Sequence, residues 1–385
     1  MKKLIFLILA VFSGISSFAL PPVTFEQLFN ELKMEINKVS DEYNSTTYIY
    51  FKRLEEINKE IKNPELNSEK VLRLLLEKDD IKEKIHNSGI SYNFKLVKLR
   101  YKKGIDLIKL LYEKILDLDH HFTALNTYQN IANISNPNSY PEFIKSKDAL
   151  TENIKNKSSI ELPDILKSNI YVSLATTVVS SFLGSGKKKL RKEEMDNISC
   201  ILDFTALMHS DLNIIYYETE FLKDNNISLN NEINKLFFDY TKVIKYKTNL
   251  KECRNNDDWD NIDEHLDLFL KELEKMIKKP SGSPENRKAL KYISNLEFSL
   301  DKVLNFLNKY SSFVDQGSKY YNKFYKIINN YKNVNKCSSK LPNQYERLKS
   351  DIKLSIEKFK TAYDIGELKG TGLRDLIYGV PDAYN

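Results

Sequence analysis

The chain contains few residues that break helices. Of its 385 residues, only 11 are glycine and 10 are proline. Sandwiches and barrels need such residues at frequent turns, so their scarcity argues against an all-β fold and favours long helices. The sequence therefore predicts an all-α protein, built as an elongated bundle of long antiparallel helices with coiled-coil-like packing.

Cysteine is also scarce, and 3 residues in so long a chain exclude a disulfide-rich scaffold. Cys200 and Cys253 lie at similar distances on either side of the tripeptide Asp224-Asn225-Asn226. If that tripeptide is the turn of a helical hairpin, the two cysteines sit at the same level of the two helices. We therefore predict a Cys200–Cys253 disulfide, which leaves Cys337 unpaired.

The motifs of common active sites and cofactor sites are absent. The chain has no GxSxG, no HExxH, no CxxC and no Rossmann glycine pattern. Gly184-Ser185-Gly186-Lys187 resembles part of a phosphate-binding loop, but the motif's first glycine and final Ser or Thr are replaced by Ser181 and Lys188. We expect no cofactor and no small-molecule substrate, and an enzyme of unknown class is only the third hypothesis.

Neither the histidines nor the acidic residues form a recognisable metal site. His120 and His121 are adjacent, and neighbours on a helix point about 100° apart, so they cannot easily share one ion. The acidic run from Asp257 to Glu274 lacks the central glycine of an EF-hand loop. We interpret that run as the solvated face of a helix and predict no metal ligands.

Residues 168–186 contain no charged side chain, unlike the rest of the sequence. Wound as a helix, they place apolar residues on one stripe and Ser and Thr on the other face, and a basic cluster follows. The stripe can be central in the bundle, can dock a partner or a second copy, or can insert into a membrane. The candidate partner- or membrane-facing residues are Ile170, Leu174, Val178, Phe182, Lys187, Lys188 and Lys189.

Membrane insertion defines the alternative function. Long helices, an uncharged stretch in mid-chain and flanking lysines form an arrangement similar to that of secreted α-helical pore-forming toxins, although no motif is shared. The many Ser and Thr residues of the stretch weaken its insertion. The leading interpretation is therefore that a protein surface covers this helix.

The first residues have the features of a secretory signal peptide. Lys2 and Lys3 precede a short apolar run, and Ser17-Phe18-Ala19 fits a cleavage site. We expect cleavage after Ala19 and a secreted protein, periplasmic or extracellular. The remaining chain divides, at polar or Pro- and Gly-containing segments, into an N-terminal region (20–132), a linker (133–163), a central region (164–279) and a basic C-terminal region (280–385).

Hydrophobic spacing predicts where the helices begin and end. We expect helices at about 24–61, 68–86 and 92–131, the second of them ended by Asn87-Ser88-Gly89, then the hairpin around 224–226 and helices near 290–313, 318–331 and 342–363.

The sequence thus favours a non-enzymatic structural or interaction protein, with a protein partner or self-association. A membrane partner remains an alternative. Nucleic acid is disfavoured despite the net charge of +6, because the chain carries a secretion signal and its lysines are scattered over helix faces.

Overall fold

A computed structural model describes residues 25–63, 67–146, 148, 190–280, 282–331 and 343–362. Within these ranges the chain is helical with connecting turns and contains no β-strand. The helices are α2 (Phe25–Glu60), α3 (Ser68–Ala124), α4 (Thr127–Ile134), η1 (Pro137–Ser139), α7 (Leu190–Thr241), η3 (Lys242–Ile244), α8 (Leu250–Asn255), α9 (Trp259–Ile277), α10 (Pro284–Tyr331) and α11 (Asn343–Ala362). The prediction of an all-α protein is confirmed for the described residues.

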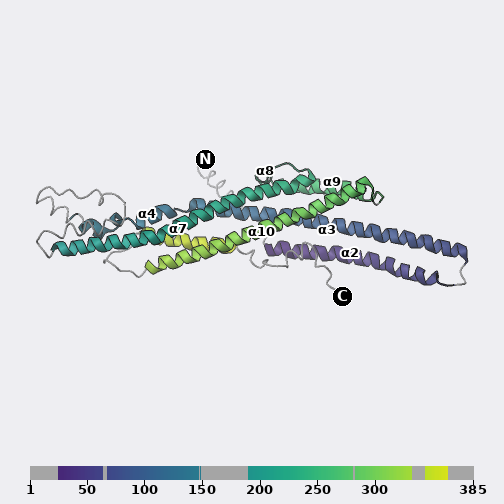
Figure 1. Ribbon diagram of the computed structural model, residues 1–385, viewed down its shortest axis with the longest axis horizontal. Coiled ribbons are helices and arrows are strands. Elements are labelled where there is room, and N and C mark those ends of the chain that lie inside the picture. The colour runs from purple at the N-terminus through teal and green to yellow at the C-terminus, as the bar shows by residue number, and fades with distance from the viewer. Residues whose placement is uncertain are drawn as a thin grey trace, which may run out of the picture.

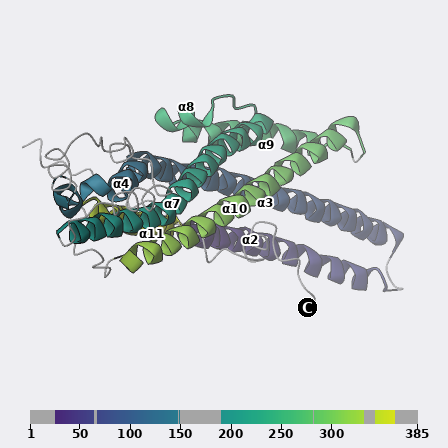
Figure 2. The same ribbon diagram turned by 60° about the vertical axis from the view of Figure 1, so that its left-hand side comes forward.

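The three longest helices, α3, α7 and α10, run along the long axis of the molecule (Figure 1). α7 and α10 lie side by side and are joined by the ion pairs Lys323–Glu218 at 3.0 Å and Lys309–Glu232 at 2.7 Å. α3 packs against both helices. α4 and α11 lie at the end of the molecule where α7 begins (Figure 2).

One large hydrophobic core joins α3, α4, α7, α9, α10 and α11. At its centre, the hydroxyl of Tyr101 donates to the backbone oxygen of Tyr240 (2.5 Å), and the Tyr240 hydroxyl donates to the backbone oxygen of Tyr101 (3.0 Å). The two rings stack with centroids 4.3 Å apart. Gly104 makes this crossing possible, because a Cβ atom there would collide with the Tyr240 hydroxyl.

A second close approach fixes α11 on α10. A Cβ atom at Gly317 would collide with the ring of Phe359, so only glycine admits that ring. Phe359 is fully buried, and its ring also meets those of Phe122, Phe313 and Tyr321 at centroid distances of 6.1, 5.8 and 5.4 Å. The last helix is therefore held by aromatic packing against both α3 and α10.

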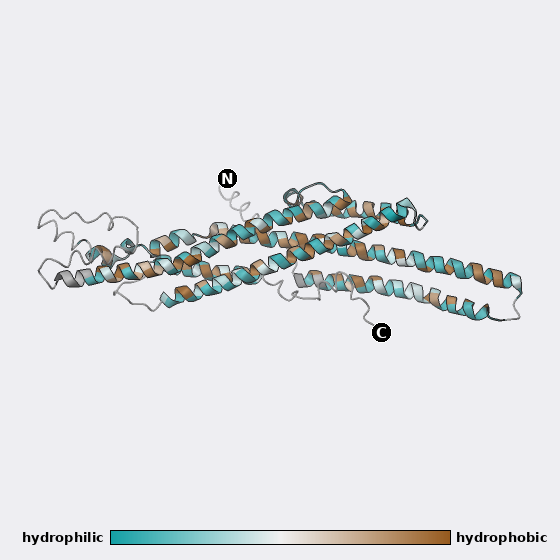
Figure 3. Cartoon of the chain, in the orientation of Figure 1, coloured by the Kyte–Doolittle hydropathy of each residue, from teal (hydrophilic) through white to brown (hydrophobic). Residues whose placement is uncertain are grey.

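A smaller, separate core lies where α2 and the start of α3 extend past the turn between α9 and α10 (Figure 1). Its buried apolar residues are Ile57, Leu74 and Ile81. We call residues 40–60 of α2 and 68–92 of α3 the arm, and the helices that share the large core the body. Figure 3 shows apolar residues along the arm out to its tip.

Several predicted helix boundaries agree with the structure. The side chain of Asn67 caps α3 by accepting a hydrogen bond from the backbone N–H of Lys70 (2.9 Å). The turn before α10 contains Gly282 with a φ of 82°, a conformation that favours glycine. α2 and α11 also span nearly the predicted ranges.

Three predicted breaks are wrong, because α3 continues through Gly89, α7 through Asn226 and α10 through residues 314–317. The helix predicted at 92–131 is also wrong at its end, since α3 stops at Ala124 and α4 follows. Gly89 faces the Tyr43 hydroxyl of α2 and stays helical although a glycine costs a helix roughly 1 kcal/mol. Asn226 is buried, and its side-chain amide donates to the backbone oxygen of Ile115 on α3 (3.2 Å). Asn226 is of a residue type that is common in turns, but here its side chain joins two helices.

The predicted Cys200–Cys253 disulfide is also wrong. Cys253 is a free, buried cysteine, whereas Cys200 is disulfide-bonded. Because α7 does not turn back at residues 224–226, Cys200 and the end of the helix at Thr241 are separated by about 60 Å of helix. Cys253 follows on α8, far from the level of Cys200.

The predicted linker at 133–163 begins with ordered turns, since η1 and a helical segment at 141–146 follow α4. The uncharged stretch at 168–186 lies outside the described residues, and so do Ile170, Leu174, Val178, Phe182, Lys187, Lys188 and Lys189.

Candidate interaction surface

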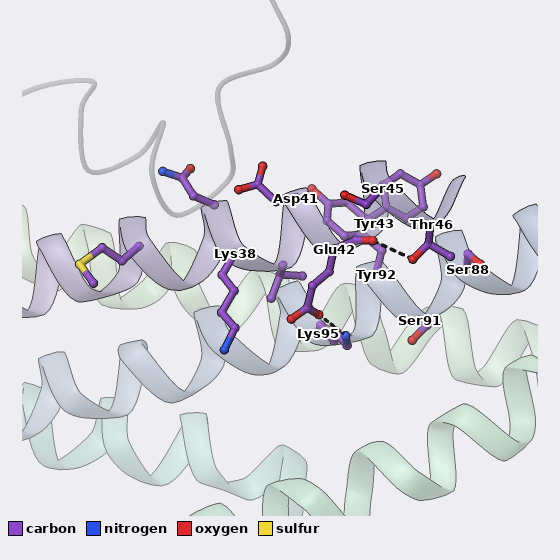
Figure 4. Close-up of a pocket in the computed structure, with 13 residues that line it drawn as sticks. Lys38, Asp41, Glu42, Tyr43, Ser45, Thr46, Ser88, Ser91, Tyr92 and Lys95 are labelled. Carbon is purple, nitrogen blue, oxygen red and sulfur yellow. Dashed lines mark hydrogen bonds and ion pairs between the residues drawn. The ribbon is translucent and has the colours of Figure 1, made fainter. Parts of the chain in front are cut away.

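An open groove of about 1070 Å³ lies at the base of the arm, between α2 and α3 (Figure 4). Its lining combines hydroxyl groups, charges of both signs and a few apolar side chains. The lining residues are Met34, Asn37, Lys38, Val39, Asp41, Glu42, Tyr43, Ser45, Thr46, Ser88, Ser91, Tyr92 and Lys95. This is the chemistry of a polar contact surface.

The floor of the groove is held by contacts between the two helices. The rings of Tyr43 and Tyr92 stack with centroids 4.5 Å apart, and the Tyr92 hydroxyl shares a hydrogen bond of 3.1 Å with Ser40. Beside them, Lys95 donates to Glu42 at 2.8 Å (Figure 4). That hydrogen bond lowers the pKa of Glu42, so this carboxylate stays charged and paired at neutral pH.

Towards the tip, one edge of the arm is a network of charges. Arg53 donates to Glu77 across the two helices at 2.7 and 3.0 Å, and to Glu56 and Glu60 on its own helix. These hydrogen bonds raise the pKa of Arg53 and lower that of Glu77. The network fixes the register of the two helices at the tip.

Large apolar side chains are exposed over the rest of the arm. They are Tyr48, Ile49, Phe51, Leu72, Leu75 and Leu76, with Met34 on α2 just before the arm. Scattered apolar residues are ordinary on a protein surface. What sets the arm apart is that it carries them on an element that projects past the body, because α7 of the body exposes as many large apolar side chains: Leu207, Ile214, Tyr217, Phe221, Ile227 and Phe238.

The exposure follows from the number of helices in the arm. Each helix can cover only one stripe of its neighbour, and in α3 that stripe contains Leu74 and Ile81. Leu72, Leu75 and Leu76 point to other sides of the same turns and find no third helix among the described residues. The arm therefore has more apolar surface than its own packing can bury.

The histidine singled out in the sequence has a structural role. His121 is buried, and its Nε2 lies 2.8 Å from the Ser355 hydroxyl on α11. That hydroxyl donates to the backbone oxygen of Asp351, so it accepts a hydrogen bond from the Nε2–H group of a neutral His121. Burial, with a smaller effect of Lys358, lowers the pKa of His121. Within the described ranges, no cluster of His, Cys, Asp and Glu is arranged to hold a metal ion.

One helix in the described part of the chain, the segment Asp196–Ile244, is long and apolar enough to cross a membrane. Its apolar residues Ile201, Met208, Leu212 and Ile215 are buried in the large core, which accounts for their hydrophobicity without a bilayer.

The sequence-based argument missed the arm surface. Phe51, Leu72, Leu75 and Leu76 have the helical spacing of residues that a helix buries, so the sequence does not set them apart from core residues. A signal was present, because Val71, Leu72, Leu74, Leu75 and Leu76 occupy more of one helix than a single stripe can hold.

Comparison with known proteins gives no relative. No family model matches the chain, and neither a curated protein nor a solved structure is similar to it.

Proposed function

We propose that this is a secreted or periplasmic, non-enzymatic interaction protein. Its body is an elongated, coiled-coil-like bundle of long antiparallel helices, and its arm presents the contact surface to other macromolecules. One observation carries the proposal: the arm projects past the body and exposes Tyr48, Ile49, Phe51, Leu72, Leu75 and Leu76.

The free energy of burying these apolar side chains supports this assignment. Burying one such side chain in a contact contributes roughly 1.5–3 kcal/mol, so several on one element can drive association. The body positions them well, because α3 continues without a break from the large core into the arm. A contact made at the arm is thereby coupled to a rigid helix of the body.

Secretion is supported by the signal-like residues 1–19 and by the disulfide at Cys200, because disulfides form and persist in oxidising compartments. N-terminal sequencing of the exported protein is expected to begin at Leu20. A retained N-terminus in the cytosolic fraction would reject this part of the proposal.

Site-specific photocrosslinking in the producing cell tests the role of the arm. A photoreactive residue at Phe51 is expected to form crosslinks, whereas one at Leu354 or Leu268, which are equally exposed on the body, is expected to form few. If all three positions crosslink alike, or none does, the arm is not the contact surface.

A further inference from the structure

The two edges of the arm have different chemistry, and the difference indicates which partner covers it. This inference rests on the proposed function of the arm. Arg53 and Glu77 mark one edge, where the helices are bridged by charge. Asn58 and Lys78 mark the other edge, where the Lys78 ammonium donates to the Asn58 side chain at 2.7 Å.

The Asn58 edge carries four of the exposed apolar residues. Phe51 lies two turns before Asn58, and Tyr48 lies one turn before Phe51, so both project on this edge. On α3, Leu75 lies one turn before Lys78 and Leu72 one turn before Leu75. The exposed fractions are 69% for Tyr48, 55% for Phe51, 58% for Leu72 and 43% for Leu75.

These residues form two apolar levels along the arm. α2 and α3 run in opposite directions here, since Glu31 pairs with Lys103 and Asn58 with Lys78. In this register Leu72 and Leu75 lie opposite the end of α2, about twelve residues beyond Tyr48 and Phe51. That separation is about 18 Å. One level is supplied by α2 and the other by α3.

We propose that a second copy of this chain covers the Asn58 edge, with the two arms antiparallel about a two-fold axis. In this arrangement the Tyr48–Phe51 level of each arm meets the Leu72–Leu75 level of the other. The four helices then form a four-helix bundle, and the contact is self-complementary, as a two-fold interface must be. The axis passes near Asp79, midway between the two levels.

The surface has the size that such a dimer needs. A standard interface buries roughly 800 Å² on each partner, and about 65% of a homodimer interface is apolar. Tyr48, Phe51, Leu72, Leu75 and the adjoining Leu76 together expose on the order of 500 Å² of side-chain surface. The apolar area of the arm thus matches that of a small homodimer interface.

The charges between the two levels are compatible with a second copy. Glu55 pairs with Lys59 at 2.7 Å, and Asp79 pairs with Lys82 at 3.3 Å, each within one helix. Bringing two arms together therefore leaves both pairs intact. The two-fold axis brings Asp79 of the two copies together, and the Lys82 ammonium 3.3 Å from each carboxylate offsets their repulsion.

A pair of neighbouring aspartates provides the first test. Asp79 lies on the Asn58 edge, and Asp80 lies on the Arg53 edge. Each makes one exposed ion pair, with Lys82 and Lys84 respectively, so the substitutions Asp79→Cys and Asp80→Cys remove equivalent contacts. A short bismaleimide is expected to join two full-length chains through position 79 and not through position 80. Equal crosslinking at both positions, or none, would overturn the arrangement.

Association in solution provides the second test. Sedimentation equilibrium of the full chain is expected to show a dimer, and Leu75→Glu is expected to weaken it on the order of 100-fold, because a charge enters both copies of the interface. Ile49→Glu is the matched control, since Ile49 is exposed on the Arg53 edge of the same arm. Circular dichroism checks that both variants keep their helices.

The outcomes separate this inference from the proposed function. A dimer that Leu75→Glu weakens and Ile49→Glu does not supports the inference. A monomer at every concentration, or a dimer insensitive to Leu75→Glu, overturns it. If photocrosslinks from Phe51 then join another macromolecule, the arm remains the contact surface with a different partner; if Phe51 gives no more crosslinks than Leu354, the proposed function fails as well.

Discussion

α3 passes through two regions of the molecule that are packed very differently. In the body, Tyr101, Ile108, Leu111 and Ile115 are completely or almost completely buried, with α7 and α10 around them. In the arm, the same helix has only α2 beside it among the described helices, and a small core of three buried apolar side chains. A continuous helix thus has interior packing at one end and exposed apolar surface at the other, and we propose that the first gives stability and the second binding.

The largest effect is expected in the body. Phe359→Ala removes a ring that is enclosed by Phe122, Phe313 and Tyr321, and should lower the free energy of unfolding by about 3–5 kcal/mol. Leu354→Ala is the control, because that side chain is exposed on the same helix. Chemical denaturation measures both variants. Similar losses for the two would show that α11 is not held by this aromatic cluster.

In the arm, an equivalent truncation should act locally. Ile57→Ala opens the small core and should lower the free energy of arm opening by about 2 kcal/mol, while the midpoint for unfolding of the body hardly changes. Limited trypsin digestion should then cut faster near Arg53 and Arg73. Ile49→Ala, an exposed neighbour, should leave the digestion unchanged. A large fall in the unfolding midpoint with Ile57→Ala would mean that arm and body unfold as one unit.

A smaller, pH-dependent effect is expected at His121. Burial lowers its pKa below the ordinary value of 6.5, so between the two values the unfolded chain binds a proton that the folded chain does not. The stability of the body should therefore decrease as the pH falls below about 6.5, by no more than about 1.4 kcal/mol per pH unit for this single group.

His121→Gln is the matched variant, because its amide can still donate to Ser355 but does not titrate. The difference in unfolding free energy between wild type and variant, measured from pH 8 to pH 5, should shift in favour of the variant at acid pH. A difference that is independent of pH would contradict a neutral, buried His121.

The smallest effect concerns the thiols and leaves stability unchanged. Burial raises the pKa of Cys253, so the thiol should resist alkylation in the folded protein and react once the chain is unfolded. Cys200 should react only after reduction. Peptide mapping with and without a reductant distinguishes the two residues. Alkylation of Cys200 without a reductant would contradict its assignment to a disulfide.

The sequence predicted the helices well where local chemistry decides their limits. The cap at Asn67, the turn at Gly282 and the limits of α2 and α11 follow from residues that favour those backbone conformations. The sequence-based prediction of helix limits failed where contacts with residues far away in the chain determine whether a helix continues. Gly89 and Asn226 resemble turn residues but lie inside long helices, and the hydrogen bond of Asn226 to Ile115 joins two of those helices.

The same limitation applies to the contact surface. Hydrophobic spacing identifies a stripe that some neighbour covers, but it does not say how many neighbours a helix has. Leu72 and Leu75 have the spacing of buried residues and are exposed because, among the described helices, only α2 accompanies this part of α3. The erroneous disulfide followed from the missed continuity of α7, since an equal distance from a turn has meaning only where the turn exists.

Hydrogen exchange along α3, in dilute solution where single copies predominate, tests most directly whether arm and body differ. Backbone amides at residues 71–85 are expected to exchange on the order of 100-fold faster than those at 101–118, because the arm opens without the body. Uniform protection along the whole of α3 would contradict the account, since it would mean that the two regions form a single cooperative unit.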